Sequence, residues 1–449
     1  MKVLGVAELT LLLIYLLRQH KKYGYFVFLN IRKLAFSFWL GAFGLYNLGI
    51  SSLLQPDIPI NILGFLIIGN FAVMAGMKTK TESRMEAVAE GVAGESFPGR
   101  YIKCVYFLLA GGILSFVLSF VNYGFTLFHQ NKINRTELVL PYLYNSIVVC
   151  SIFLYYLFRT NGTFFRKGCR LLVFAISVFM LLCMLNRGNI IFIFTAVLIL
   201  ELFLYFSRTK KKYISLKGVV LVSAFLASAV FMFGVVGDMR FETVSREVYH
   251  MRYVELYGLS PEFPSGLGQL YMYLVSPLEN MSHVLMEQEV THYTFFCNLF
   301  YPGIKLIANL IGKGGVFSGW LSGQYEIYPY LQPRAGLNVM SFMADAYQDL
   351  GIAGIVVYLA FYDFILVAAD KVLHSKMYGI SKTIIYSFMI QIVLWGIFTN
   401  SVFRMGNLWV NIFFVFVMDT FVRCVHFSGK KIGGPKNAAG ENSGHTGQP

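Results

Sequence analysis

The sequence predicts an all-α polytopic membrane protein, and its composition, its long apolar runs and its charge distribution each support this fold class. Apolar residues make up 57% of the 449 residues and charged residues 13%, against roughly 45–50% and 25% in a soluble domain. Inside a bilayer each backbone polar group needs an internal partner, so the apolar runs are expected to be helices. We expect a transmembrane helical bundle of about 11 spans, with 12 or 13 as alternatives, and one large exported loop containing short interfacial helices.

Apolar windows close to the ~20 residues that cross a bilayer recur along the chain. The predicted spans cover about 3–17, 34–54, 58–76, 101–121, 139–158, 171–186, 189–207, 218–237, 350–370, 384–403 and 406–424. The first span lacks a small-residue cleavage site and is followed by Arg18, Lys21 and Lys22. These features favour a retained helix over a cleaved signal peptide.

The spans divide the chain into four parts. Residues 1–237 hold spans 1–8, residues 238–348 form the large extracytoplasmic loop, residues 349–427 hold spans 9–11, and residues 428–449 form a cytoplasmic tail. The tail is polar and glycine-rich, which predicts disorder.

Three segments between the spans carry their own predictions. In the large loop, residues 268–286 and 294–312 are apolar enough to lie at the bilayer surface. Pro277 and Glu279 interrupt the first of them, which argues against a further span, although two additional spans stay an alternative. The inner segment 77–100 is polar and rich in Gly and Glu, so we expect a flexible connector.

The distribution of cationic residues predicts the orientation. Of the 37 Lys and Arg residues, 26 fall in the segments on one side of the alternating spans. Cytoplasmic loops carry such an excess, so the N-terminus is expected outside and the C-terminus inside a bacterial cytoplasmic (inner) membrane. The net charge of +14 is spread between apolar runs, which indicates contact with the anionic leaflet rather than with nucleic acid. The 6 cysteines show no metal-ligand spacing.

Arg187 is the most informative charged residue. It follows Asn186 and precedes Gly188 inside the apolar stretch 171–207, which is too long for one crossing. An Arg at the bilayer centre costs about 2.5 kcal/mol or more. We therefore expect a tight hairpin with Gly188 in the turn and Arg187 at the outer surface, where it could hold an anion. A snorkelling Arg bonded to lipid phosphate is the structural alternative.

A second group of charged residues follows the eighth predicted span. Asp238, Arg240, Glu242, Arg246, Glu247, His250, Arg252 and Glu255 lie within 18 positions of one another. On a helix several of them would be i,i+3 or i,i+4 neighbours. Arginine suits a pyrophosphate because its planar fork makes paired charge-assisted hydrogen bonds, and His or Glu can accept a hydroxyl proton. A solvated, salt-bridged helix is the alternative reading.

Further candidates come later in the chain. Arg404 lies on the outer side between the last two spans, and lipid contact is its alternative role. The remaining loop candidates are His283, His292, Arg334, Asp345, Tyr347 and Asp349. Asp349 and Gly351 could instead shape the start of the ninth span.

The layout resembles the oligosaccharide repeat-unit polymerases of bacterial O-antigen and capsule pathways, the Wzy type. The resemblance is carried by the multi-span arrangement, the Arg-Gly turn in LCMLNRGNIIFIFTAVLI, the dominant late loop, and NVMSFMADAYQDLGIAGIVVYLAFYDFILV entering the next span. It covers nearly the whole chain in layout, but its motifs are short.

The resemblance implies a membrane glycosyltransferase that passes a growing glycan from undecaprenyl pyrophosphate to a lipid-linked repeat unit. It implies no cofactor, and its expected partners are the lipid-linked oligosaccharide, membrane lipids and a chain-length regulator protein. Arg187 matches the family's outward Arg-Gly turn and is expected to contact the pyrophosphate. Arg240, Arg252 and Arg404 are further binding candidates from charge and side alone. His250 and Glu255 are the expected bases, with His292 in reserve.

Two rival functions remain open at this point. An O-antigen ligase shares the layout and the leaving group but passes the glycan to a lipid A core sugar. A transporter or flippase for a lipid-linked sugar would show charged or broken helices near the midplane, whereas the charges here collect at the predicted outer face.

Overall fold

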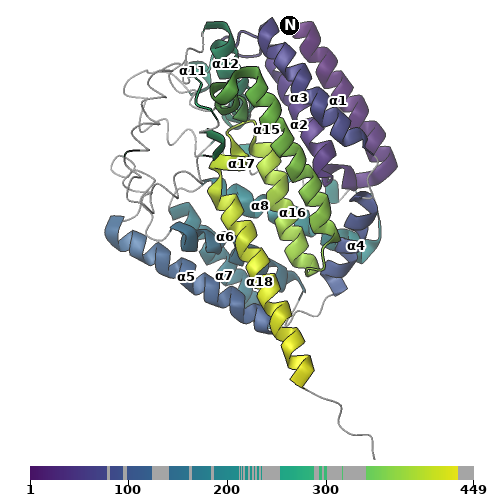
Figure 1. The fold of residues 1–449 in the computed structure, drawn as a ribbon, viewed down its shortest axis with the longest axis vertical. Coiled ribbons are helices and arrows are strands. Elements are labelled where there is room, and N and C mark those ends of the chain that lie inside the picture. The colour runs from purple at the N-terminus through teal and green to yellow at the C-terminus, as the bar shows by residue number, and fades with distance from the viewer. Residues whose placement is uncertain are drawn as a thin grey trace, which may run out of the picture.

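The computed structural model describes residues 1–77, 81–94, 99–123, 141–160, 164–183, 187–211, 253–287, 293–295, 298–300, 316 and 340–432, with isolated residues between 213 and 234. Helices account for 87% of this part, which contains no strand. The all-α fold class is therefore confirmed for the residues that are described. Figure 1 shows a bundle of long helices with short helices at its ends.

Seven of the described helices are long and apolar enough to cross a membrane. They are α1 with η1 (Lys2–Phe28), α3 (Ile58–Gly76), α5 (Gly99–Tyr123), α6 (Pro141–Thr160), α8 (Arg187–Thr209), α15 (Phe342–His374) and α18 (Gly406–Ile432).

Three more helices lie in predicted spans but are not both long enough and apolar enough to be counted with these seven. They are α2 (Ile31–Leu48), α7 (Phe164–Cys183) and α16 (Gly379–Trp395). Because the predicted span at 218–237 is described only in isolated residues, the count of about 11 stays a prediction.

Local sequence signals explain where several of these helices begin and how they pack. The Asn30 side chain caps α2 by accepting hydrogen bonds from the backbone N–H groups of Arg32 and Lys33, and Asp57 caps α3 in the same way. The helices α1 and α2 lie side by side, and Gly5 makes this possible. A Cβ at Gly5 would lie 2.7 Å from the backbone nitrogen of Leu48.

The bundle has two distinct ends, which we name after α12 and α4, the helices that lie there. The α12 end holds α11 (Tyr253–Leu256) and α12 (Ser265–Glu287), together with the connection between α2 and α3. The α4 end holds α4 (Thr81–Gly94), and Figure 1 shows α4 far from α11 and α12. On the predicted topology the α12 end faces outward and the α4 end faces the cytoplasm.

Contacts between distant segments show which other helix ends meet at the α12 end. The backbone N–H of Phe342, at the start of α15, donates to the Gly396 carbonyl, at the end of α16. The Trp395 ring packs edge-to-face against Phe192 in α8, with 5.9 Å between centroids. Phe398, which packs against Trp395, also packs against Tyr273 in α12. The starts of α8 and α15 and the end of α16 therefore lie together at the α12 end.

The helix α4 corrects the prediction of a flexible connector at residues 77–100. Its residues Met85, Val88, Ala89 and Val92 are buried, and the helix contacts α8, α15 and α16. These four positions recur at helical spacing and form one apolar face. A flexible connector was expected because the average polarity of the segment is high. The better signal was the helical spacing of its few apolar residues.

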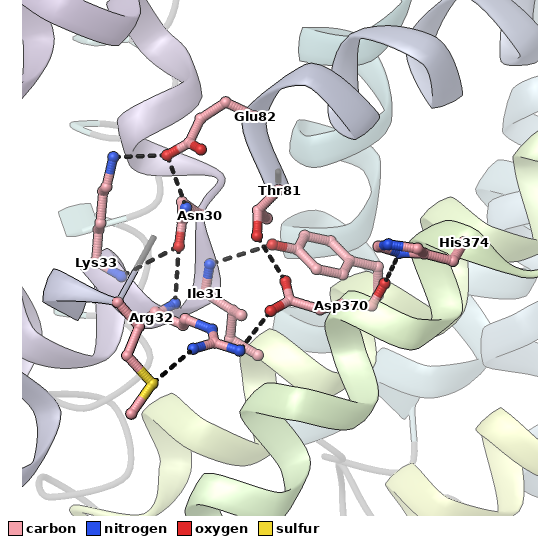
Figure 2. Close-up of polar contacts among 10 residues, drawn as sticks. Asn30, Ile31, Arg32, Lys33, Thr81, Glu82, Asp370 and His374 are labelled. Carbon is pink, nitrogen blue, oxygen red and sulfur yellow. Dashed lines mark hydrogen bonds and ion pairs between the residues drawn. The ribbon is translucent and has the colours of Figure 1, made fainter. Parts of the chain in front are cut away.

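An ion pair and a hydrogen bond tie α4 to its neighbours, as Figure 2 shows. Asp370 in α15 accepts hydrogen bonds from Arg32 Nη2 at 2.6 Å and from Thr81 Oγ1 at 2.8 Å. Lys33 Nζ lies 2.6 Å from Glu82 Oε1. These contacts join α2, α4 and α15 at the α4 end.

Candidate functional site

The six residues proposed from the sequence fall into three groups in the structure. Three lie outside the described residues, namely Arg240, His250 and Arg252. Arg187 and Arg404 have a described backbone, at the start of α8 and at the end of α17 (Ser401–Arg404). Glu255 lies in α11 and is partly exposed. No described contact joins Arg187, Arg404 and Glu255. The support for a shared site is that all three lie at the same end of the bundle.

Arg187 is the first residue of α8, which corrects the predicted turn. The chain passes from α7 to α8 at residues 184–186, and the two helices contact each other. Gly188 lies in the first turn of α8 and so does not form the turn. Arg187, Gly188 and Asn189 instead form the start of α8. Asn189 lies inside the bundle, where it donates to Asn145 Oδ1 at 3.3 Å.

The position of Arg187 has an electrostatic consequence. The first backbone N–H groups of a helix lack partners within the helix, and the helix dipole places partial positive charge there. The start of α8 therefore favours a negative charge over a positive one. Phe192, less than two turns further along α8, packs against α16 and fixes the direction of this helix start.

The short helix α17 sets the backbone of Arg404 at the same end of the bundle. Ser401 Oγ and Tyr362 Oη are 2.9 Å apart, which joins α17 to α15. Phe403 packs against the rings of Tyr358 and Phe361, also in α15. Trp409 Nε1 donates to the Val402 carbonyl at 2.6 Å.

The MADAYQDLG segment forms a broken helix. Ser341 caps the start of α15 by accepting from the N–H of Met343, and the helix is interrupted at Leu350 and Gly351. The sequence predicted a span beginning at 350, and the structure adds a helical piece at 342–349 before the break. Asp345 and Asp349 lie on this piece.

Asp349 serves as a structural acceptor. Its carboxylate is fully buried and accepts hydrogen bonds from the backbone N–H groups of Asn298 and Leu299, from Thr294 Oγ1 at 2.5 Å and from Tyr358 Oη at 2.6 Å. These donors occupy both carboxylate oxygens. Asp349 therefore holds Thr294, Asn298 and Leu299 against α15.

A polar cluster in α12 was not predicted as a unit. Glu279 is 1% exposed and lies one helical turn before His283, with 3.3 Å between Oε1 and Nε2. From the sequence, Glu279 is expected only to interrupt the apolar segment 268–286, and His283 is one of several loop candidates. The i,i+4 spacing of a carboxylate and an imidazole was the signal that could have paired them. Pro277 lies within α12 without ending it.

Contacts of α12 show where this cluster lies. Tyr271 Oη accepts from the backbone N–H of Ile50 at 3.1 Å, and Ser282 Oγ donates to Asp57 Oδ2. Both partners belong to the connection between α2 and α3. Because contacts along about three turns of α12 reach the same short connection, the helix lies across this end of the bundle.

Metal binding and known relatives add no assignment. The described residues contain no group of three or more His, Cys, Asp or Glu side chains placed to hold a metal ion. Comparison of the chain with protein-family models, with curated proteins and with solved structures finds no match.

Proposed function

We propose that this protein is an oligosaccharide repeat-unit polymerase of the O-antigen or capsule type. The observation that carries the proposal is the position of Arg187 at the N-terminus of α8, at the same end of the bundle as α11, α12 and α17. The start of a helix that carries an arginine favours the binding of an anion. A lipid pyrophosphate at the outer membrane surface is an anion that this arrangement suits.

The proposed reaction is a glycosyl transfer between two lipid-linked substrates. The acceptor sugar hydroxyl loses its proton to a base, and its oxygen attacks the anomeric carbon of the growing glycan. The bond from that carbon to undecaprenyl pyrophosphate breaks, and the pyrophosphate leaves with the electron pair. Cationic groups that bind the leaving group stabilise the negative charge that develops on it.

Arginines supply the anion contacts in this proposal. Arg187 binds the pyrophosphate, and Arg240, Arg252 and Arg404 contribute further positive charge. Glu255 or His250 accepts the hydroxyl proton, as proposed from the sequence. The protein would act in the bacterial inner membrane, with the α12 end outside, and a chain-length regulator protein is a proposed partner.

Deletion and complementation of the gene test this proposal. Cells that lack the gene receive the wild type, Arg187→Ala or Arg208→Ala, and surface polysaccharide is separated on a gel. Arg208 is a matched control because it lies in the last turn of the same helix, at the other end of the bundle. Membrane levels of each variant are measured in parallel so that loss of protein is not taken for loss of activity.

The outcomes separate three functions. A polymerase predicts a single repeat unit in the deletion strain, and a ladder restored by the wild type and Arg208→Ala but not by Arg187→Ala. Full-length polymer that accumulates on the undecaprenyl carrier would identify a ligase. Repeat units that stay on the cytoplasmic side of the membrane would identify a flippase.

A further inference from the structure

Tyr293 and Phe295 are two exposed aromatic residues beside the start of α15. Their side chains are 43% and 71% exposed. Thr294, between them, donates its backbone N–H to the Gln348 carbonyl at 3.0 Å, which places the pair next to the helical piece at 342–349. The ring centroids lie 6.5 Å apart and the ring planes meet at 73°. The two rings therefore do not stack on each other, and neither covers the flat face of the other completely.

The backbone of Phe295 has an uncommon conformation. Its φ is 45°, and a positive φ is a genuine outlier for a bulky residue. Such a conformation persists only where the surrounding structure fixes it, and it recurs at ligand-binding sites. The conformation of Phe295 therefore calls for a functional explanation as well as a structural one.

Contacts with α15 fix this backbone. The N–H of Phe295 donates to the Asp349 carbonyl at 3.2 Å, and the Thr294 hydroxyl donates to Asp349 Oδ1 at 2.5 Å. Gly351 makes room for the neighbouring tyrosine, because a Cβ at Gly351 would lie 3.2 Å from Tyr293 Oη. Both exposed rings are thus carried by a backbone that α15 holds in place.

An aromatic belt at the membrane surface is the structural alternative for these two residues. Lipid is fluid and adapts to a ring in any orientation, so a belt residue needs no particular backbone conformation. A ligand of one fixed shape gains from rings that are held in place, because less conformational freedom is lost when it binds. Exposed rings on a constrained backbone therefore favour a specific ligand.

A series of contacts joins this aromatic pair to α17 and indicates which ligand that is. The Tyr358 hydroxyl donates to Asp349 Oδ2 at 2.6 Å, and Phe403 packs edge-to-face against Tyr358 with 5.7 Å between centroids. Phe403 directly precedes Arg404, one of the arginines proposed to bind pyrophosphate. In a lipid-linked oligosaccharide the first sugar is bonded to the pyrophosphate. A surface for sugar rings is therefore expected beside the anion site.

We propose that Tyr293 and Phe295 bind a sugar ring of the lipid-linked oligosaccharide. This inference rests on the proposed polymerase function and names the part of the site that holds the glycan. A sugar ring has a face of C–H groups and an edge of hydroxyl groups. The face packs on an aromatic ring, and a tyrosine adds a hydroxyl that can hydrogen-bond to the edge. The aromatic pair holds the glycan and takes no part in bond formation.

Equilibrium binding of two ligands tests this assignment. Purified full-length protein in nanodiscs is given undecaprenyl-pyrophosphate oligosaccharide, extracted from cells lacking the gene, or undecaprenyl pyrophosphate without sugar. The variants are Phe295→Leu, which keeps an apolar side chain but removes the flat ring, and Phe295→Tyr, which keeps the ring. Phe364→Leu is the matched control, because Phe364 is 65% exposed further along α15.

We expect the oligosaccharide ligand to bind Phe295→Leu about 10-fold more weakly than the wild type, since removal of an anchoring aromatic side chain commonly brings such a loss. Phe295→Tyr and Phe364→Leu should match the wild type. The sugar-free ligand should bind all four proteins equally. An unchanged affinity of Phe295→Leu for the oligosaccharide ligand would overturn the inference. An equal loss for both ligands would also overturn it, because the ring would then contact lipid or only support the fold.

Footprinting of the wild type gives a second test that needs no variant. Hydroxyl radicals modify exposed aromatic side chains, and mass spectrometry maps the modified residues. The oligosaccharide ligand should protect Tyr293 and Phe295, whereas the sugar-free ligand should leave them reactive. Protection by both ligands, or by neither, would overturn the inference. If protection depends on the glycan but the wild type never extends it, the polymerase function fails and the sugar site stands.

Discussion

Gly351 shows how one residue shapes the candidate site. Its φ of 62° and ψ of −143° belong to a region that is essentially restricted to glycine. This conformation separates the helical piece at 342–349 from the rest of α15. A side chain at the position would also approach Tyr293, because a Cβ would lie 3.2 Å from Tyr293 Oη.

Replacing Gly351 should therefore destabilise the protein. We expect Gly351→Ala to cost about 1–3 kcal/mol, the usual cost of a strained backbone conformation. Gly69→Ala is the matched control, because Gly69 lies in the interior of α3 and a Cβ there meets nothing within 4 Å. That change should be neutral or stabilise by about 0.5–1 kcal/mol. Thermal unfolding of the purified proteins compares them, and equal midpoints would contradict the account of the break.

The sequence indicated that several residues matter for the structure, but it did not indicate which contacts they make. Asp349 and Gly351 were expected to shape a helix start, and they do so through the break and through the contacts of Asp349 with Asn298 and Leu299. These two partners are 51 and 50 positions away from Asp349, and no local pattern identifies them. The role of Glu279 could not be predicted for a similar reason. Its burial depends on Tyr46 in α2 and on Gln55 in the connection between α2 and α3.

At the scale of elements, the attachment of α4 depends on a buried ion pair. Lys33 in α2 and Glu82 in α4 have side chains that are 8% and 16% exposed, whereas the Lys210–Glu90 pair is 57% exposed on both sides. Removing one partner of a buried pair leaves an uncompensated charge. An exposed pair is screened by water, so its loss matters little.

These two ion pairs give a matched prediction. Lys33→Gln should destabilise the docking of α4 by about 3–5 kcal/mol, and Lys210→Gln by less than about 1 kcal/mol. Trypsin cleavage at Arg84 in inside-out membrane vesicles reports the opening of α4. Since about 1.4 kcal/mol corresponds to a tenfold change, Lys33→Gln should speed cleavage about 100-fold or more. Similar rates in the two variants would show that this ion pair does not hold α4.

The positions of most long helices could be predicted because apolar length is a strong local signal. Residues 58–76 were expected as a span and form α3 over the same range. By contrast, α4 and the helical piece before Leu350 depend on packing against distant segments. The same holds for the candidate site. Its arginines could be predicted because they are charges in apolar surroundings, whereas the Glu279–His283 pair could not, because it depends on the α2–α3 connection.

At the scale of the whole molecule, the sidedness of the two ends is a direct prediction. In a cysteine-free background, Glu262→Cys and Glu90→Cys place thiols at exposed positions of the α12 end and of α4. A membrane-impermeant maleimide added to spheroplasts should label Glu262→Cys at once and Glu90→Cys only after lysis. The reverse pattern would place the C-terminus outside and remove the basis for an outer anion site.

The central claim is that this protein alone joins lipid-linked repeat units. The most direct measurement incubates the purified wild type in liposomes with undecaprenyl-pyrophosphate oligosaccharide as the sole sugar substrate, and follows carrier-linked products by mass spectrometry. Our account predicts products of two, three and more repeat units, with release of undecaprenyl pyrophosphate at each addition. Unextended substrate, or transfer that requires an added lipid A core acceptor, would contradict it.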